Sequence, residues 1–180
     1  KNFIFPWPSI HSIADNIWFY AEMDVRGVMV QGNYVTTGSD LVVLKNYVWR
    51  HLMWDPSLQT DPLIREFCDG YYGPAADAMY AYVQGVENSV REPKMIHASE
   101  FARPGYLTQP ARENLRELRA KAVAASGGRD PYKRRVREGT VGIEALTLFN
   151  PGPLVEKDGR LVGRNLEEYT YDRARNVVSH

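Results

Sequence analysis

The spacing of apolar residues near the start of the chain predicts two strands, each followed by a helix. Residues 1–5 and 27–31 are short, mainly apolar runs without alternating polar residues, which is typical of strands buried on both faces. The first run leads through the stiff loop Pro6-Trp7-Pro8, and the second through a polar loop, into a stretch with apolar residues at helical spacing, over about 10–23 and 41–55. This order is the rhythm of a parallel sheet whose strands are joined by helical crossovers.

Both predicted helices have start or stop signals. Ser9 can cap the first helix, and Ser39 or Asp40 can cap the second. Asp55 precedes Pro56, and a residue before proline is pushed out of the helical region. We therefore expect the second helix to end at Asp55.

Two strands alone do not make a stable sheet. A strand buried on both faces needs neighbours on both edges, because its backbone groups must be hydrogen-bonded. We therefore expect residues 1–56 to be part of a larger parallel sheet or barrel. Open strand edges would be sticky, so a homo-oligomer formed through them is a possible assembly.

From residue 57 onward the pattern predicts a helical domain with one small β-hairpin. Residues 57–180 contain apolar stripes separated by glycine and proline. The expected helices cover about 60–73, 75–91, 110–126, 130–149 and 166–178. The hairpin is expected near 154–162, where two apolar pairs flank Lys157-Asp158-Gly159. The predicted fold class is thus α/β followed by mainly α.

Composition excludes several kinds of site. The 22 basic and 22 acidic residues give a formal charge of zero, so nothing draws the whole chain toward nucleic acid or an anionic membrane. The single Cys68 rules out an internal disulfide and a cysteine-based zinc site. No apolar run approaches the roughly 20 residues that span a membrane. We expect no cofactor, no nucleic-acid partner and no membrane partner.

Four segments carry a family resemblance. They are GVMVQGN (27–33), LKNYVWRHLMWDP (44–56), LIREFCDGYYGPAADAMYAY (63–82) and RRV (134–136). Together they resemble a bacterial family of uncharacterised, glycoside-hydrolase-like proteins, the domain of unknown function family 4838, which is related to the α-glucuronidases. The resemblance implies that residues 1–56 are the last two βα units of a (β/α)8 barrel. It also implies a protein that acts on carbohydrate, with catalytic acids upstream of Lys1, and a secreted or periplasmic location.

In barrel enzymes the active site lies at the C-terminal ends of the strands. The candidate substrate-binding residues are therefore Trp7, Gln31, Asn33 and Tyr34, with His11 near the first loop. Trp7 could stack on a sugar ring, although packing of its loop explains it equally well. Amides orient a hydroxyl group but cannot shuttle protons, and a glycosidase needs two carboxylates. We therefore assign no catalytic residue and no metal ligand.

Other conspicuous side chains are better explained by packing. Trp49 and Trp54 lie in a predicted helix and at its end, where core packing is favoured over sugar contact. His51 and His97 have no partner at metal-ligand spacing, and Cys68 is expected to be a small buried apolar residue.

Three functional hypotheses follow. The first is the C-terminal portion of a glycoside-hydrolase-like protein. The second is a non-catalytic helical interaction module that packs on a partner or on a second copy. The third, a nucleic-acid binder that uses the basic residues 133–137, is disfavoured because acidic residues nearby predict a salt-bridged surface.

Overall fold

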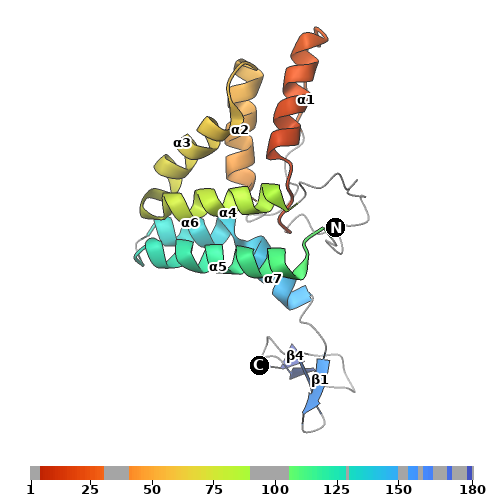
Figure 1. The fold of residues 1–180 in the computed structure, drawn as a ribbon, viewed down its shortest axis with the longest axis vertical. Coiled ribbons are helices and arrows are strands. Elements are labelled where there is room, and N and C mark those ends of the chain that lie inside the picture. Colours follow the sequence, from red (N-terminus) through yellow and green to blue (C-terminus); the bar gives the residue numbers. More distant parts are fainter. Residues whose placement is uncertain are drawn as a thin grey trace. The chain divides into compact units, whose positions relative to one another are not determined.

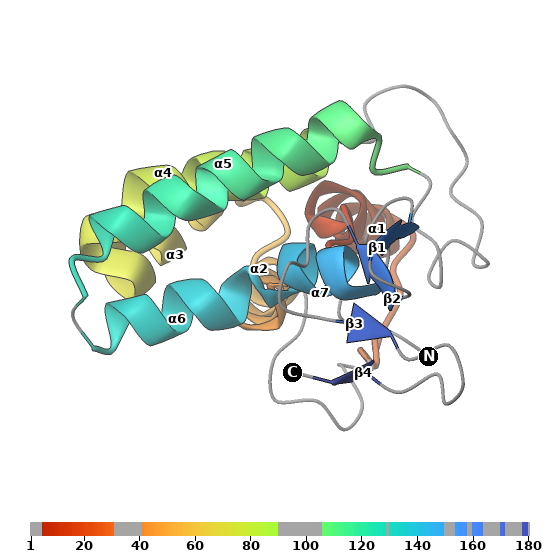
Figure 2. The ribbon, with the colours of Figure 1, turned by 90° about the horizontal axis from the view of Figure 1, so that it is seen from below.

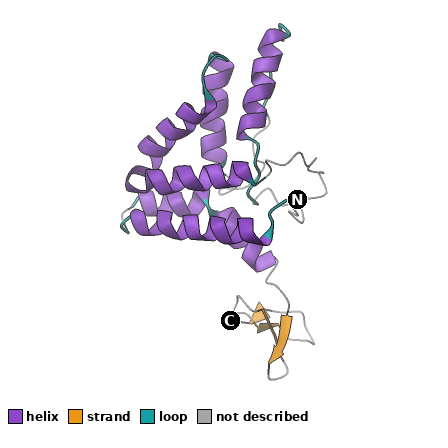
Figure 3. Ribbon diagram, viewed as in Figure 1, coloured by secondary structure: helices purple, strands orange, loops and turns teal. Residues whose placement is uncertain are grey.

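The chain is organised as two compact units, Lys1–Gly142 and Ile143–His180. The structure is a computed structural model that describes residues 5–30, 41–89, 106–128 and 130–149, and short strands between 154 and 179. Helices make up the regular structure of the first unit over these residues (Figures 1 and 3). They are α1 (Ile10–Glu22), α2 (Val42–Trp54), α3 (Thr60–Tyr72), the short 3-10 helix η1 (Gly73–Ala75), α4 (Ala76–Asn88), α5 (Gln109–Ala125) and α6 (Tyr132–Gly139). Helix α7 (Val141–Phe149) crosses from the first unit into the second.

The helices of the first unit pack in sequence-neighbour pairs. Helices α1 and α2 stand side by side, with their C-terminal ends at the same end of the unit (Figure 1). Helices α4 and α5 lie along each other, as the turned view shows (Figure 2). Helix α3 contacts both α2 and α4, and so it joins the two pairs.

The predicted portion of a (β/α)8 barrel is wrong. The described residues of the first unit contain no strand. Residues 27–30 have no regular secondary structure, and Met29 is 91% exposed. Phe5 is buried in a bend, while residues 1–4 lie outside the described residues. The physical reason is that an apolar run indicates a preference for burial, whereas a strand also requires a neighbouring backbone with which to pair.

The helix boundaries follow the local signals in most places. Helix α2 ends at Asp55 as predicted, and its N-cap is Leu41 with φ of 53°; Ser39 and Asp40 lie outside the described residues. Thr108 caps α5 by accepting a hydrogen bond from the Ala111 amide (3.4 Å). After α5 the chain turns through two glycines with positive φ, Gly127 and Gly128, which end the helix in the left-handed conformation that glycine adopts readily.

The single helix expected over 130–149 is two helices. They separate at Thr140, whose backbone (φ −117°, ψ 10°) is not helical. The buried Thr140 hydroxyl donates to the Val136 carbonyl at 2.7 Å, and this side-chain bond competes with the regular helical pattern. At the end of α6, a Cβ on Gly139 would lie 2.6 Å from the Tyr72 hydroxyl, so α6 and α3 are in close contact at this glycine.

The second unit contains a small antiparallel sheet of β1 (Leu154–Lys157), β2 (Arg160–Gly163), β3 (Thr170–Tyr171) and β4 (Val178–Ser179), in that order. The pairing of β1 with β2 is the hairpin expected near 154–162. The helix expected over 166–178 is wrong, because 170–171 and 178–179 are strands. Thr170, Tyr171 and Val178 favour strands, and β3 pairs with β2, a partner that helical spacing does not reveal.

Candidate functional site

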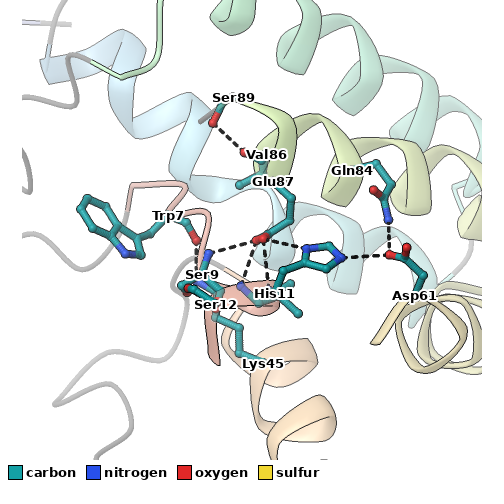
Figure 4. Close-up of polar contacts among 11 residues, drawn as sticks. Trp7, Ser9, His11, Ser12, Lys45, Asp61, Gln84, Val86, Glu87 and Ser89 are labelled. Carbon is teal, nitrogen blue, oxygen red and sulfur yellow. Dashed lines mark hydrogen bonds and ion pairs between the residues drawn. The ribbon is translucent and has the colours of Figure 1, made fainter. Parts of the chain in front are cut away.

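The described residues bring four polar side chains together where α1 meets α3 and α4 (Figure 4). We call this group the His11 clasp; it consists of His11, Asp61, Gln84 and Glu87. His11 Nδ1 lies 3.1 Å from Glu87 Oε2, and His11 Nε2 lies 3.1 Å from Asp61 Oδ1. Gln84 Nε2 donates to the same Asp61 oxygen at 3.0 Å. The clasp thus connects three helices through one imidazole ring.

Glu87 also caps the N-terminus of α1 from another helix. Its Oε1 accepts from the amides of Ser9 (3.0 Å) and Ile10 (3.1 Å), and its Oε2 accepts from the His11 amide (3.4 Å). The first amides of a helix lack partners within the helix and attract negative charge. The prediction that the Ser9 side chain caps this helix is therefore wrong. Ser9 makes no side-chain capping bond, and the Glu87 carboxylate caps the helix instead.

The ring of His11 fits both carboxylates only when it is protonated. A neutral imidazole has one N–H, whereas an imidazolium donates from both nitrogens. The hydrogen bond to Glu87 raises the pKa of His11; burial opposes this rise, and the hydrogen bond to Asp61 adds to it. Burial alone would raise the pKa of Glu87, but the bonds from the His11 ring and from the α1 amides outweigh it, so the pKa of Glu87 is lowered.

Trp7 lies beside the clasp, in the loop that leads into α1. Its carbonyl accepts from Lys45 Nζ at 2.8 Å, which ties the loop to α2. Its half-buried ring meets the Tyr106 ring edge-on, with centroids 5.3 Å apart. The Tyr106 hydroxyl donates to the Pro6 carbonyl. The structure therefore gives Trp7 a packing role, and stacking on a sugar stays a prediction.

The other predicted substrate-binding residues, Gln31, Asn33 and Tyr34, lie outside the described residues. His11, named with them as a candidate, is the centre of the clasp. Asp61 and Glu87 were not predicted, because they lie 50 and 76 residues from His11 and no local motif connects them. The only signal in the sequence was the acidic first turn of the helix after residue 59.

The clasp is not arranged for hydrolysis of a glycosidic bond. Glycosidases place two carboxylates on either side of the bond that breaks, whereas here the ring of His11 occupies the space between Asp61 and Glu87. Within the part of the chain that the structure describes, no group of three or more potential ligands could hold a metal ion. Cys68 is buried as predicted, and burial raises the pKa of its thiol to about 12, so it is not a reactive thiol.

The basic residues at 133–137 are partly used in packing. Arg135 Nη1 donates to the Tyr71 carbonyl at 2.9 Å, and its guanidinium lies 4.4 Å from the centre of the Tyr71 ring. Arg134 lies 3.9 Å from Glu138. Arg135 therefore fastens α6 to the end of α3.

Residues 1–84 match the model of the family described as "Domain of unknown function (DUF4838)". This segment belongs to that family. The predicted resemblance is thereby confirmed at the level of the family, and the relation to glycoside hydrolases stays a prediction. No curated protein and no solved structure matches the chain. The DUF4838 segment includes α1, α2, α3 and most of α4, and hence three of the four clasp residues.

The DUF4838 segment also carries the large apolar side chains that the structure leaves in solvent. We call ten of the twelve found among the described residues the exposed apolar surface; they lie on α1, on the residues directly after it and at the end of α2. They are Trp18, Phe19, Tyr20, Met23, Val25, Val28, Met29, Val30, Met53 and Trp54. Trp54 is 92% exposed, so the core packing predicted for it is wrong. Among the described residues, no helix is long and apolar enough to cross a membrane.

Proposed function

We propose that residues 1–142 form a non-catalytic helical interaction module that binds a partner protein through the exposed apolar surface. The observation that carries this proposal is the last part of α1. Ile17 is buried there, while Trp18, Phe19 and Met23 point apolar side chains into solvent. A helix that is apolar on all sides is normally covered on all sides. Contiguous exposed apolar groups on a folded protein usually mark an interaction site.

The side chains of the exposed apolar surface are large enough to supply the free energy of binding to a partner. Burying a large apolar side chain contributes roughly 1.5–3 kcal/mol. Association itself costs several kcal/mol in lost motion, so a few scattered contacts would not suffice. Aromatic residues and methionine are the types enriched in interface cores, and Trp18, Phe19 and Met29 belong to these types.

The charges around this surface favour a different protein over a second copy. On α1 and the residues after it, exposed Asp15, Glu22 and Asp24 accompany it, against Arg26, which pairs with Asp24 at 2.7 Å. On α2 the exposed base near this surface is Arg50, so the acidic residues outnumber the bases. In a two-fold dimer the same surface faces itself, so the acidic residues would be brought together. The partner should therefore present an apolar patch flanked by lysine or arginine. The homo-oligomer predicted through open sheet edges is not proposed, since the sheet on which it rested is absent from the described residues.

A site-specific cross-linking experiment tests the proposal. A photo-reactive residue replaces Met29 in the cells that make the protein, and a control variant carries it at the exposed Ala124 on α5. We expect one protein to be captured from position 29 and not from position 124. With that protein purified, calorimetry should give binding weakened on the order of tenfold by Met29→Asp or Trp18→Asp, and unchanged by Ala124→Asp.

Two outcomes would overturn the proposal. One is that position 29 captures nothing beyond the control, and the other is that the captured protein binds the Asp variants as tightly as the native chain. Capture of a second copy alone would replace it with self-association. Circular dichroism of each variant separates lost binding from lost folding.

A second proposal keeps the carbohydrate function that the resemblance implies. Its support is the set of exposed rings, Trp18, Phe19 and Trp54, because aromatic side chains commonly line ligand sites. In this proposal the module holds a carbohydrate chain by stacking and performs no hydrolysis.

A further inference from the structure

Helix α1 carries much of the exposed apolar surface but is held to the unit by few apolar contacts. Of its thirteen residues, Ile10 and Ile17 are the buried ones. By comparison α3 buries five residues, and so does α4. Buried apolar area is the main source of helix attachment. The attachment of α1 therefore depends on polar contacts more than that of α3 or α4 does, and the His11 clasp supplies them at its first turn.

The groups that face His11 come from two of the helices against which α1 packs. Glu87, from α4, and Asp61, from α3, each approach one ring nitrogen, and the uncharged Gln84 approaches Asp61 (Figure 4). On α2, the third neighbour, the cation in this region is Lys45, which donates to the Trp7 carbonyl. Two carboxylates thus face the ring, an arrangement that a charged imidazolium satisfies and a neutral imidazole does not.

We propose that the His11 clasp is a pH-sensitive fastener, which holds α1 against α3 and α4 while the ring is protonated and loosens it when the ring loses its proton. On deprotonation the ring keeps one N–H. One of its two charge-assisted hydrogen bonds is then lost, because a ring nitrogen without a hydrogen faces a carboxylate oxygen and both atoms are acceptors. The carboxylate left behind gains water, because Asp61 is largely exposed. The fastener can act in the isolated protein. Because α1 carries part of the exposed apolar surface, the position of this surface should also depend on pH, and a role for that change in binding rests on the proposed function.

The pH range follows from the directions of the two shifts. The pKa of His11 is raised above its ordinary value of 6.5, so its contribution is complete below 6.5 and is lost as the pH rises through the raised value. The pKa of Glu87 is lowered below 4.5, so its contribution is present above 4.5 and is lost as the pH falls through the lowered value. The clasp is therefore closed between about 4.5 and 6.5 and opens above that range.

Hydrogen exchange of the full chain tests this. After correction for intrinsic rates, amides of α1 should exchange about five- to tenfold faster near pH 8.5 than near pH 5.5, while amides of α4 change little. The His11 ring resonances should titrate above 6.5. In His11→Gln the pH dependence of α1 should disappear, and in Asp61→Asn its midpoint should move down.

His51→Gln is the matched control, because His51 contacts only its own helix in the described contacts, through the Tyr47 carbonyl and ring. This variant should keep the pH dependence of α1. Exchange of α1 that does not vary with pH in the native chain, or that varies equally in His11→Gln, would overturn the fastener. If α1 responds to pH but Met29 binds nothing, the proposed function fails while the fastener stands.

Discussion

Individual residues in this chain are constrained most where helices approach most closely. The clearest case is Gly139, where a Cβ would lie 2.6 Å from the hydroxyl of Tyr72. Tyr72 is only 2% exposed and lies edge-on to the ring of Phe67, so it has little room to move. The absence of a side chain at position 139 is thus a packing requirement at the contact between α6 and α3.

Gly139→Ala is expected to destabilise the protein by about 1–2 kcal/mol. Alanine would gain up to about 1 kcal/mol in helix propensity, but overpacking against a fixed side chain costs about 1–3 kcal/mol. Gly70→Ala on α3 is the matched control, because a Cβ there meets nothing within 4 Å. It should stabilise the protein by up to about 1 kcal/mol. Urea unfolding of both variants measures the difference, and an equal gain for both would show that Tyr72 can move aside.

At the scale of elements, α1 is capped by a side chain that comes from another helix. Glu87 accepts from three amides at the start of α1 and also contacts the His11 ring. A hydrogen bond to a charged group contributes more to the free energy of unfolding than a neutral one does. Removing the acceptor is costlier still when the donor is left buried without a partner. One carboxylate therefore stabilises a helix to which it does not belong.

Glu87→Ala is expected to cost about 1–3 kcal/mol and to expose the first turn of α1 to exchange. Glu113→Ala on α5 removes the same kind of group from an exposed surface, where it accepts only from Gln109 among the described contacts, and should change stability by less than about 0.5 kcal/mol. Thermal unfolding and amide exchange at Ser9, Ile10 and His11 report both effects. Similar small losses for the two variants would mean that water replaces Glu87 without cost.

The helices were predictable from the sequence to the extent that their signals are local. Apolar spacing located α1, α2, α3, α4 and α5, and the stops at Asp55 and at the glycines after α5 are set by neighbouring residues. The strand expected at 27–31 failed because pairing depends on a distant backbone. The clasp was missed for the same reason, since Glu87 is 76 residues from His11. Local patterns predicted most of the helices, and the contacts between helices came from the structure.

At the scale of the whole molecule, the two proposals differ in what covers the exposed apolar surface. The protein-partner and carbohydrate proposals place different demands on the same rings. A partner interface needs Met23, Val28 and Met29 as well as the aromatic residues, because it buries continuous apolar area. A carbohydrate site needs flat rings at the surface and tolerates polar substitution between them.

Nuclear magnetic resonance titration with soluble polysaccharides separates the two proposals. If the carbohydrate proposal holds, resonances of Trp54 and Trp18 should shift with added xylan or β-glucan, and Trp54→Ala should weaken that binding on the order of tenfold. Met29→Asp should leave it unchanged. Shifts that are absent for every polysaccharide, or that survive Trp54→Ala, would remove the support for stacking.

The position of Glu87 has a practical consequence for how this protein is divided. The DUF4838 match ends at residue 84, three positions before the carboxylate that closes the first turn of α1. A recombinant piece cut at the family boundary would retain α1, α2 and α3 and lose the acid that secures the earliest of them. Such a piece should behave as a frayed, aggregation-prone polypeptide, and its failure would reflect the choice of endpoint. Expression designs for this chain should therefore run past the end of α4.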